Sequence, residues 1–127
     1  MESTKTIWAA RIAGGLAVLF LIFDGVIKVI NIQAVADASA RLGLPEHLAL
    51  GIGSLELLLV AVYLVPRTAI LGAVLWTGYL GGATAIQVRA GQSWFGVLFP
   101  IFIALLLWGA IYLRDRQLRA LLPLRQR

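Results

Sequence analysis

The sequence predicts an all-α integral membrane protein, a four-helix bundle with antiparallel up-down topology. Hydrophobic residues make up 61% of the 127 residues, charged residues make up 13%, and the mean hydropathy is +0.91. Soluble domains are about half apolar and about a quarter charged. A soluble chain of this length has too small an interior to bury so much apolar surface. The charged residues gather near the ends of four long apolar segments, so lipid is the expected solvent.

Four segments are long enough to cross a hydrocarbon core of about 30 Å, which takes roughly 20 helical residues. We expect a single domain, residues 1–127, with spans at about 7–30, 46–65, 68–88 and 94–113. Pro45 and Pro66 suit the start and the stop of the second span. The turns at 66–67 and 89–93 are short, which favours antiparallel neighbours.

The longest connection contains an alanine-rich stretch, residues 33–42, followed by Gly43. Glycine is common directly after the last turn of a helix. We expect a short helix on the outer surface or folded into it, with a plain loop as the alternative.

The charge distribution predicts the orientation. The side with both termini and the 66–67 turn carries eight basic residues: Lys5, Arg11, Arg67, Arg114, Arg116, Arg119, Arg125 and Arg127. The other side has Arg41, Arg89 and, near the membrane edge, Lys28. By the positive-inside rule, both termini are expected in the cytoplasm and the protein in the cell inner (plasma) membrane. The net charge of +5 then reflects topology and contact with lipid headgroups, and no nucleic-acid partner is expected.

Several charged residues fall inside the predicted spans. Asp24 and Lys28 are four residues apart, on one face of the first helix. Asp24 lies roughly 9 Å and Glu56 roughly 12 Å inside the outer ends of their helices, at 1.5 Å per residue. Gln87 and Arg89 come from the outer end of the third span.

Asp24, Lys28, Glu56 and Arg89 sum to zero charge, which suits a buried, mutually neutralised network. In one interpretation the network is structural and sets helix register and partner choice. In the other it lines an outward-facing pocket, with Glu56 as a proton-titratable or ligand-binding carboxylate. The sequence leaves both open.

An aromatic stripe adjoins the predicted cluster. Trp76, Tyr79, Ala83 and Gln87 recur at helical spacing, and Tyr63 follows Glu56 by seven residues. Ordinary core packing is the favoured interpretation. The alternative is a pocket wall, formed by Tyr63, Trp76 and Tyr79, for a flat apolar ligand such as a quinone.

The third span also contains two small-xxx-small spacings, Gly78-xxx-Gly82 and Gly81-xxx-Ala85. Such spacings let helix backbones approach closely. Tight packing inside the bundle is the favoured interpretation, and a homo-oligomer contact is the alternative.

The residue inventory limits the chemistry. Cysteine is absent, which excludes disulfides and thiolate ligands, and the single histidine, His47, is expected in an interfacial loop. No metal site is expected. We find no motif for a catalytic nucleophile or a nucleotide, so no catalytic residue is assigned and the sequence leans away from an enzyme.

Short motifs lie along nearly the whole chain: residues 23–28 (FDGVIK), 42–45 (LGLP), Glu56, 65–68 (VPRT), 77–83 (TGYLGGA), 88–89 (VR) and 114–115 (RD). In their order and spacing they resemble the DoxX-like family of small four-helix membrane proteins. The resemblance implies a four-helix membrane bundle. Relatives often have histidine where this chain has Gln87, so no role of that histidine is carried over.

Members of the family have been linked to quinone-coupled oxidation of sulfur compounds, to redox-stress complexes and, in animals, to chaperoning of receptor assembly. The resemblance therefore favours an accessory or assembly subunit of a membrane complex, with a membrane-protein partner or a homo-oligomer. The alternative is a quinone-linked oxidoreductase component that binds an apolar ligand in the pocket of Glu56 and Arg89. Proton-coupled transport through Glu56 is a weaker third hypothesis.

Overall fold

A computed structural model describes residues 4–45 and 47–125, and within these ranges every regular element is a helix. The described elements are α1 (Thr4–Ile30), α2 (Gln33–Leu42), α3 (Leu48–Leu64), the 3₁₀ turn η1 (Pro66–Thr68), α4 (Ala69–Arg89), α5 (Trp94–Arg114) and α6 (Arg116–Leu121). The all-α class is confirmed. The start predicted at residue 46 and the basic residue at position 127 lie outside the described residues.

Among the described residues, three helical segments are long and apolar enough to span a membrane. They are Thr4–Ile30, Pro66–Arg89 and Trp94–Arg114. Only 22–28% of each apolar window is buried inside the protein. Most of their apolar surface therefore needs an apolar solvent outside the fold, which a bilayer supplies. The helix α3 is also apolar but shorter, at 17 residues.

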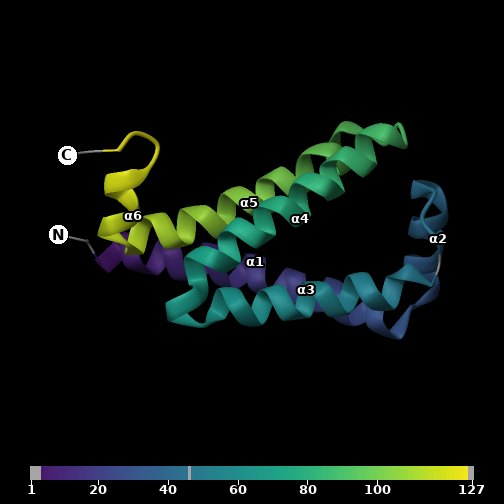
Figure 1. Ribbon diagram of the computed structural model, residues 1–127, viewed down its shortest axis with the longest axis horizontal. Helices are drawn as coiled ribbons and strands as arrows, with labels where there is room; N and C mark the ends of the chain where they lie inside the picture. The colour runs from purple at the N-terminus through teal and green to yellow at the C-terminus, as the bar shows by residue number, and fades with distance from the viewer. Residues whose placement is uncertain (1–3, 46, 126–127) are drawn as a thin grey trace.

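The long helices form two pairs along the long axis of the molecule (Figure 1). The helix α1 packs on α3, α4 packs on α5, and the pairs meet through contacts of α1 with α5 and of α3 with α4. The start of α1 and the helix α6 lie at one end, here called the terminus end. At the other end, the α2 end, the α4–α5 pair diverges from the α1–α3 pair, and α2 lies over this opening.

The apolar core fills the region where the two pairs are closest. Trp76 of α4 and Leu107 of α5 are almost completely buried, packed with Leu21, Leu59 and Tyr63. The hydroxyl of Tyr63 donates a hydrogen bond of 2.6 Å to the Leu107 carbonyl, which satisfies a polar group that would be costly to bury alone. This core fixes the pairs together below the opening.

The connection between α1 and α3 contains the helix α2 with the bounds that the sequence suggested, 33–42. Gly43 follows it at φ 74°, and the amides of Gly43 and Leu44 donate to the carbonyls of Ala40 and Ser39. This is the left-handed glycine stop expected from the sequence. The short helix, and not the plain loop, is what the chain forms.

Two glycine contacts set how closely the helices approach. A Cβ at Gly53 of α3 would lie 2.6 Å from the Gly25 carbonyl oxygen of α1, and one at Gly72 of α4 would lie 2.6 Å from Cα of Tyr63. By contrast, a Cβ added at Gly78, Gly81 or Gly82 would meet no neighbouring atom within 4 Å. The favoured prediction for the small residues of 78–85, tight packing inside the bundle, is therefore wrong. The two pairs have already diverged at that height, so no helix of the α1–α3 pair packs against these three glycines.

Adding a methyl group at Gly53 should destabilise the fold. Overpacking costs about 1–3 kcal/mol and outweighs the gain of up to about 1 kcal/mol in helix propensity. Gly53→Ala should therefore melt at a lower temperature than the unmodified protein in detergent. Gly51→Ala is the control, because position 51 has open space around it; equal melting temperatures for the two variants would contradict the close approach.

Candidate functional site

The charged cluster begins on α1. Asp24 and Lys28 are separated by one helical turn, and the Lys28 ammonium Nζ lies 2.7 Å from Oδ2 of Asp24. Both side chains are about a quarter exposed, 27% for Asp24 and 26% for Lys28. The pair is therefore neither fully solvated nor fully buried. It lies on the face of α1 that borders the opening between the two helix pairs.

Glu56 on α3 completes the cluster from below. Its side chain is fully buried, and its Oε1 lies 2.5 Å from Nζ of Lys28. The same oxygen accepts a hydrogen bond from the hydroxyl of Tyr79 on α4. That hydroxyl lies 3.4 Å from Lys28 Nζ, so the lysine has partners on three helices, counting its own. The Gly25–Gly53 contact brings α1 and α3 close enough for the ion pair to form.

One oxygen of this buried carboxylate has no partner. Within residues 4–45 and 47–125, Oε2 of Glu56 accepts no hydrogen bond, and the indole Nε1 of Trp76 is the other buried side-chain atom without one. The Trp76 ring meets the Tyr79 ring edge to face at 5.2 Å between centroids. Glu56 is thus anchored through one oxygen while the other lies unsatisfied in an apolar core, an arrangement that costs free energy.

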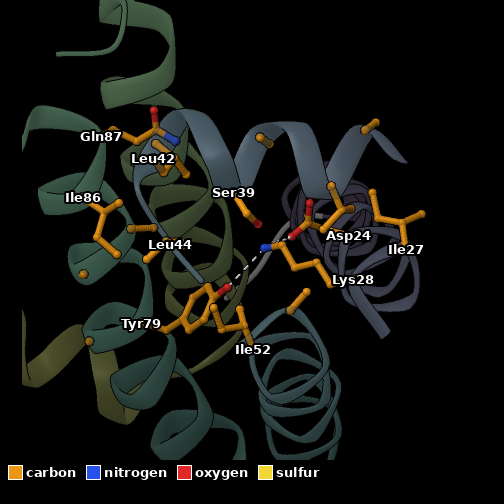
Figure 2. A pocket seen from close by; sticks show the side chains of 17 residues that line it. Asp24, Ile27, Lys28, Ser39, Leu42, Leu44, Ile52, Tyr79, Ile86 and Gln87 are labelled. Atoms are coloured by element: carbon orange, nitrogen blue, oxygen red, sulfur yellow. Dashed lines mark hydrogen bonds and ion pairs between the residues drawn. The ribbon is translucent and has the colours of Figure 1, made fainter. Parts of the chain in front are cut away.

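A cavity of about 480 Å³ lies directly above the cluster, between α2 and α4 and over the ends of α1 and α3 (Figure 2). Its walls are largely apolar, and Figure 2 shows Asp24, Lys28, Ser39 and Tyr79 together at one side of it. Its lining residues are Asp24, Ile27 and Lys28 of α1; Ala34, Val35, Ala38, Ser39 and Leu42 of α2; Leu44; Ala49 and Ile52 of α3; and Gly78, Tyr79, Gly82, Ala83, Ile86 and Gln87 of α4. Glu56 is beneath this lining and does not reach it.

The structure brings together most of the polar residues singled out from the sequence. Asp24, Lys28 and Glu56 form one network, and Gln87 lines the far side of the cavity.

Arg89 does not join this network: its guanidinium donates a 3.0 Å hydrogen bond to the Leu42 carbonyl at the end of α2. The network was expected to contain four charged residues that sum to zero. It contains three, Asp24, Lys28 and Glu56, with a formal charge of −1. Arg89 is the last residue of α4 and lies beyond the cavity lining, so its side chain reaches the C-terminal end of α2 and not the charged cluster.

The aromatic wall is only partly as predicted. Tyr79 lines the cavity and also bonds Glu56. Trp76 lies one turn deeper, inside the core, and Tyr63 lies two turns from Glu56 toward the terminus end, where it borders a smaller and more open hollow with Arg114. The interpretation of Trp76 and Tyr63 as packing residues fits their places. His47, expected in an interfacial loop, is an exposed residue just before α3.

The contribution of α2 was not anticipated from the sequence. Val35, Ala38, Ser39 and Leu42 follow the i, i+3, i+4, i+7 spacing of a single helix face, and all four line the cavity. That spacing was visible in the sequence. The direction in which this face of α2 points depends on how the two helix pairs diverge. A local sequence pattern does not predict that divergence.

An all-helical protein with three apolar helices of spanning length, whose outer surface is mostly apolar, is a multi-pass membrane protein. The DoxX-like family model matches residues 12–110, well over half of the chain, and the protein belongs to the DoxX-like family. This confirms the resemblance drawn from the short sequence stretches. No curated protein and no solved structure matches the chain.

Removing the lysine should cost more stability than removing the lysine together with its buried partner. Lys28→Met leaves Glu56 as an uncompensated buried charge, for which about 3–5 kcal/mol is typical. In Lys28→Met/Glu56→Gln that charge is gone, so much of the stability should return. Thermal unfolding of both variants in detergent, with Glu56→Gln completing the cycle, measures the coupling. If the stability losses of the two single variants add up to that of the double variant, Lys28 and Glu56 are not energetically coupled.

Proposed function

We propose that this DoxX-like protein is an accessory subunit of a membrane complex that carries a small, mainly apolar ligand in the cavity at its α2 end. The observation that supports this most is the cavity itself: about 480 Å³, apolar walls and a few polar groups at one side. Pockets of about 300–1,000 Å³ with this character are typical of sites for small molecules. The polar groups of the cluster bind one another, so they are not positioned as free catalytic groups. This arrangement suits a protein that holds a ligand more than one that transforms it.

The proposed topology has four crossings, with both termini in the cytoplasm of a cell whose inner membrane contains the protein. The 17 residues of α3 extend about 26 Å, slightly short of a 30 Å core, a mismatch that local thinning of the bilayer accommodates at modest cost. The start of α1 and the helix α6 share one end, as an even number of crossings requires. The basic residues of that end, among them Arg67 and Arg116, favour its cytoplasmic placement.

Single cysteines test this topology cleanly because the chain has none of its own. Arg67→Cys, in the turn between α3 and α4, should be shielded from a membrane-impermeant maleimide in intact spheroplasts. Gln92→Cys, in the turn between α4 and α5, should be labelled. Both should react after the membrane is permeabilised. Labelling of position 67 in sealed spheroplasts would contradict the proposed orientation.

One face of α4 is suited to contact with a partner helix. Gly81 and Ala85 are exposed, and neither belongs to the residues that line the cavity. Small residues at this spacing allow close approach of a helix from another chain, either a different membrane protein or a second copy. This face supports the accessory role, and recovery of a stable membrane partner by pull-down in gentle detergent is the result expected.

A quinone-linked oxidoreductase component is the second candidate function. The observation that favours it is Tyr79, whose ring borders the cavity while its hydroxyl bonds Glu56, so a flat ring system meets an aromatic wall beside a polar group. Under this hypothesis a short-chain quinone raises the melting temperature of the purified protein. No shift over a saturating range would eliminate it.

Filling the cavity should expel its ligand. Gly82 lines the cavity and has room for a side chain, so Gly82→Leu places an isobutyl group in that space. Protein purified in gentle detergent should release a small molecule that mass spectrometry detects, and Gly82→Leu should lose most of it. Gly51→Leu is the matched control, at an exposed glycine of α3 that has open space around it and lies outside the lining, and should retain it.

Equal ligand content in the two leucine variants would contradict binding in this cavity. Unmodified protein that carries no small molecule, and whose melting temperature is unchanged by a total lipid extract, would refute the proposed function.

A further inference from the structure

The charge of the cavity restricts its ligand. Among the described residues that line it, the charged ones are Asp24 and Lys28, and Glu56 lies just beneath them. Two carboxylates and one ammonium give a formal charge of −1. The other described cations at this end, Arg41 and Arg89, are not among the lining residues, and Arg89 is engaged with the Leu42 carbonyl.

The single ammonium is already occupied. Nζ of Lys28 lies 2.7 Å from Asp24, 2.5 Å from Glu56 and 3.4 Å from the Tyr79 hydroxyl, and an ammonium group has three donors. An anionic ligand would have to displace one of these carboxylates to reach it. Asp24 is different, because a carboxylate offers about four acceptor positions over two oxygens, and its side chain faces the cavity while partly exposed.

The carboxylate of Asp24 faces a mostly apolar cavity. The walls around it are aliphatic, including Ile27, Val35 and Ile52, so a cation placed against this carboxylate is attracted to it across apolar surroundings. A bare metal ion is a poor fit for apolar walls because hard cations require six or more oxygen ligands.

We propose, building on the proposed function, that the ligand of this cavity is a lipophilic organic cation, an amine or quaternary onium compound with an apolar body. The cationic head lies against Asp24 and the ring of Tyr79, whose π face attracts cations. The apolar body packs between α2 and α4, along Val35, Leu42 and Ile86. Anionic amphiphiles are rejected by the same field.

Two ions of nearly identical shape and opposite charge test the inference. Tetraphenylphosphonium and tetraphenylborate are titrated separately into the purified protein by equilibrium dialysis, with empty detergent micelles subtracted. Benzyltrimethylammonium is run in parallel as a smaller cation. The cations should bind saturably and tetraphenylborate should not.

Asp24→Asn should weaken binding of the cations by about tenfold or more, because the ion pair with the carboxylate is lost. Asp37→Asn is the control, because Asp37 is on α2 near the same end but outside the lining, where it accepts a hydrogen bond from Gln33. Gly82→Leu should abolish cation binding, and Gly51→Leu should leave it intact.

Two outcomes overturn the charge inference: tetraphenylborate binds saturably and as tightly as the phosphonium ion, or cation binding is unchanged by Asp24→Asn. In either case the proposed function still stands if the protein releases a small molecule from this cavity. Failure of both cations to bind also overturns the charge inference. Identical behaviour of Gly82→Leu and Gly51→Leu toward the ions and toward the co-purified small molecule refutes the proposed function as well.

Discussion

Lys28 lies between two carboxylates, one from its own helix and one from α3, and the rest of this fold is arranged around that contact. A fully buried, ionised glutamate is costly without a close cation, and the cation reaches it because Gly25 and Gly53 let the two helices touch. Tyr79 ties the same carboxylate to α4. The contact therefore joins three helices at one depth, just where the two helix pairs begin to diverge.

The divergence explains why a cavity and a charged cluster occur together. Below the cluster the core around Trp76 and Leu107 is closed and apolar. Above it no helix of the α1–α3 pair packs on α4, and α2 covers the opening without filling it. The cluster thus forms the floor between a packed core and an accessible space. The structural and the ligand-binding interpretations of the cluster need not compete, since Glu56 can anchor the helices while Asp24 faces the cavity.

The helices were predictable because length and apolarity are local properties. The helices α1, α3, α4 and α5 begin and end within a few residues of the four apolar segments expected from the sequence, and Gly43 correctly ended α2. The convergence of Asp24, Lys28 and Glu56 followed from helical rise alone. Helix rotation and tilt did not follow: Tyr63 shares a face with Glu56, yet it bonds Leu107 in the core and does not line the cavity.

Arg89 and the glycines of α4 illustrate the same limit. A long arginine side chain reaches several acceptors, and its choice of the Leu42 carbonyl depends on where α2 ends. Small-xxx-small spacing indicates a face suited to close packing but not which neighbour takes it. Both outcomes depend on the angle between two helix pairs, which is a property of the whole molecule.

The division of the cluster between α1 and α3 also bears on how the chain enters the membrane. Chains emerge from the ribosome with the N-terminus first. Asp24 and Lys28 arrive together as an internally neutral pair, whereas Glu56 arrives later with no charged residue of its own helix to offset it. We expect α3 to depend on an α1 that is already in place. In this expected order α1 inserts first and retains α3 through the salt bridge between Lys28 and Glu56.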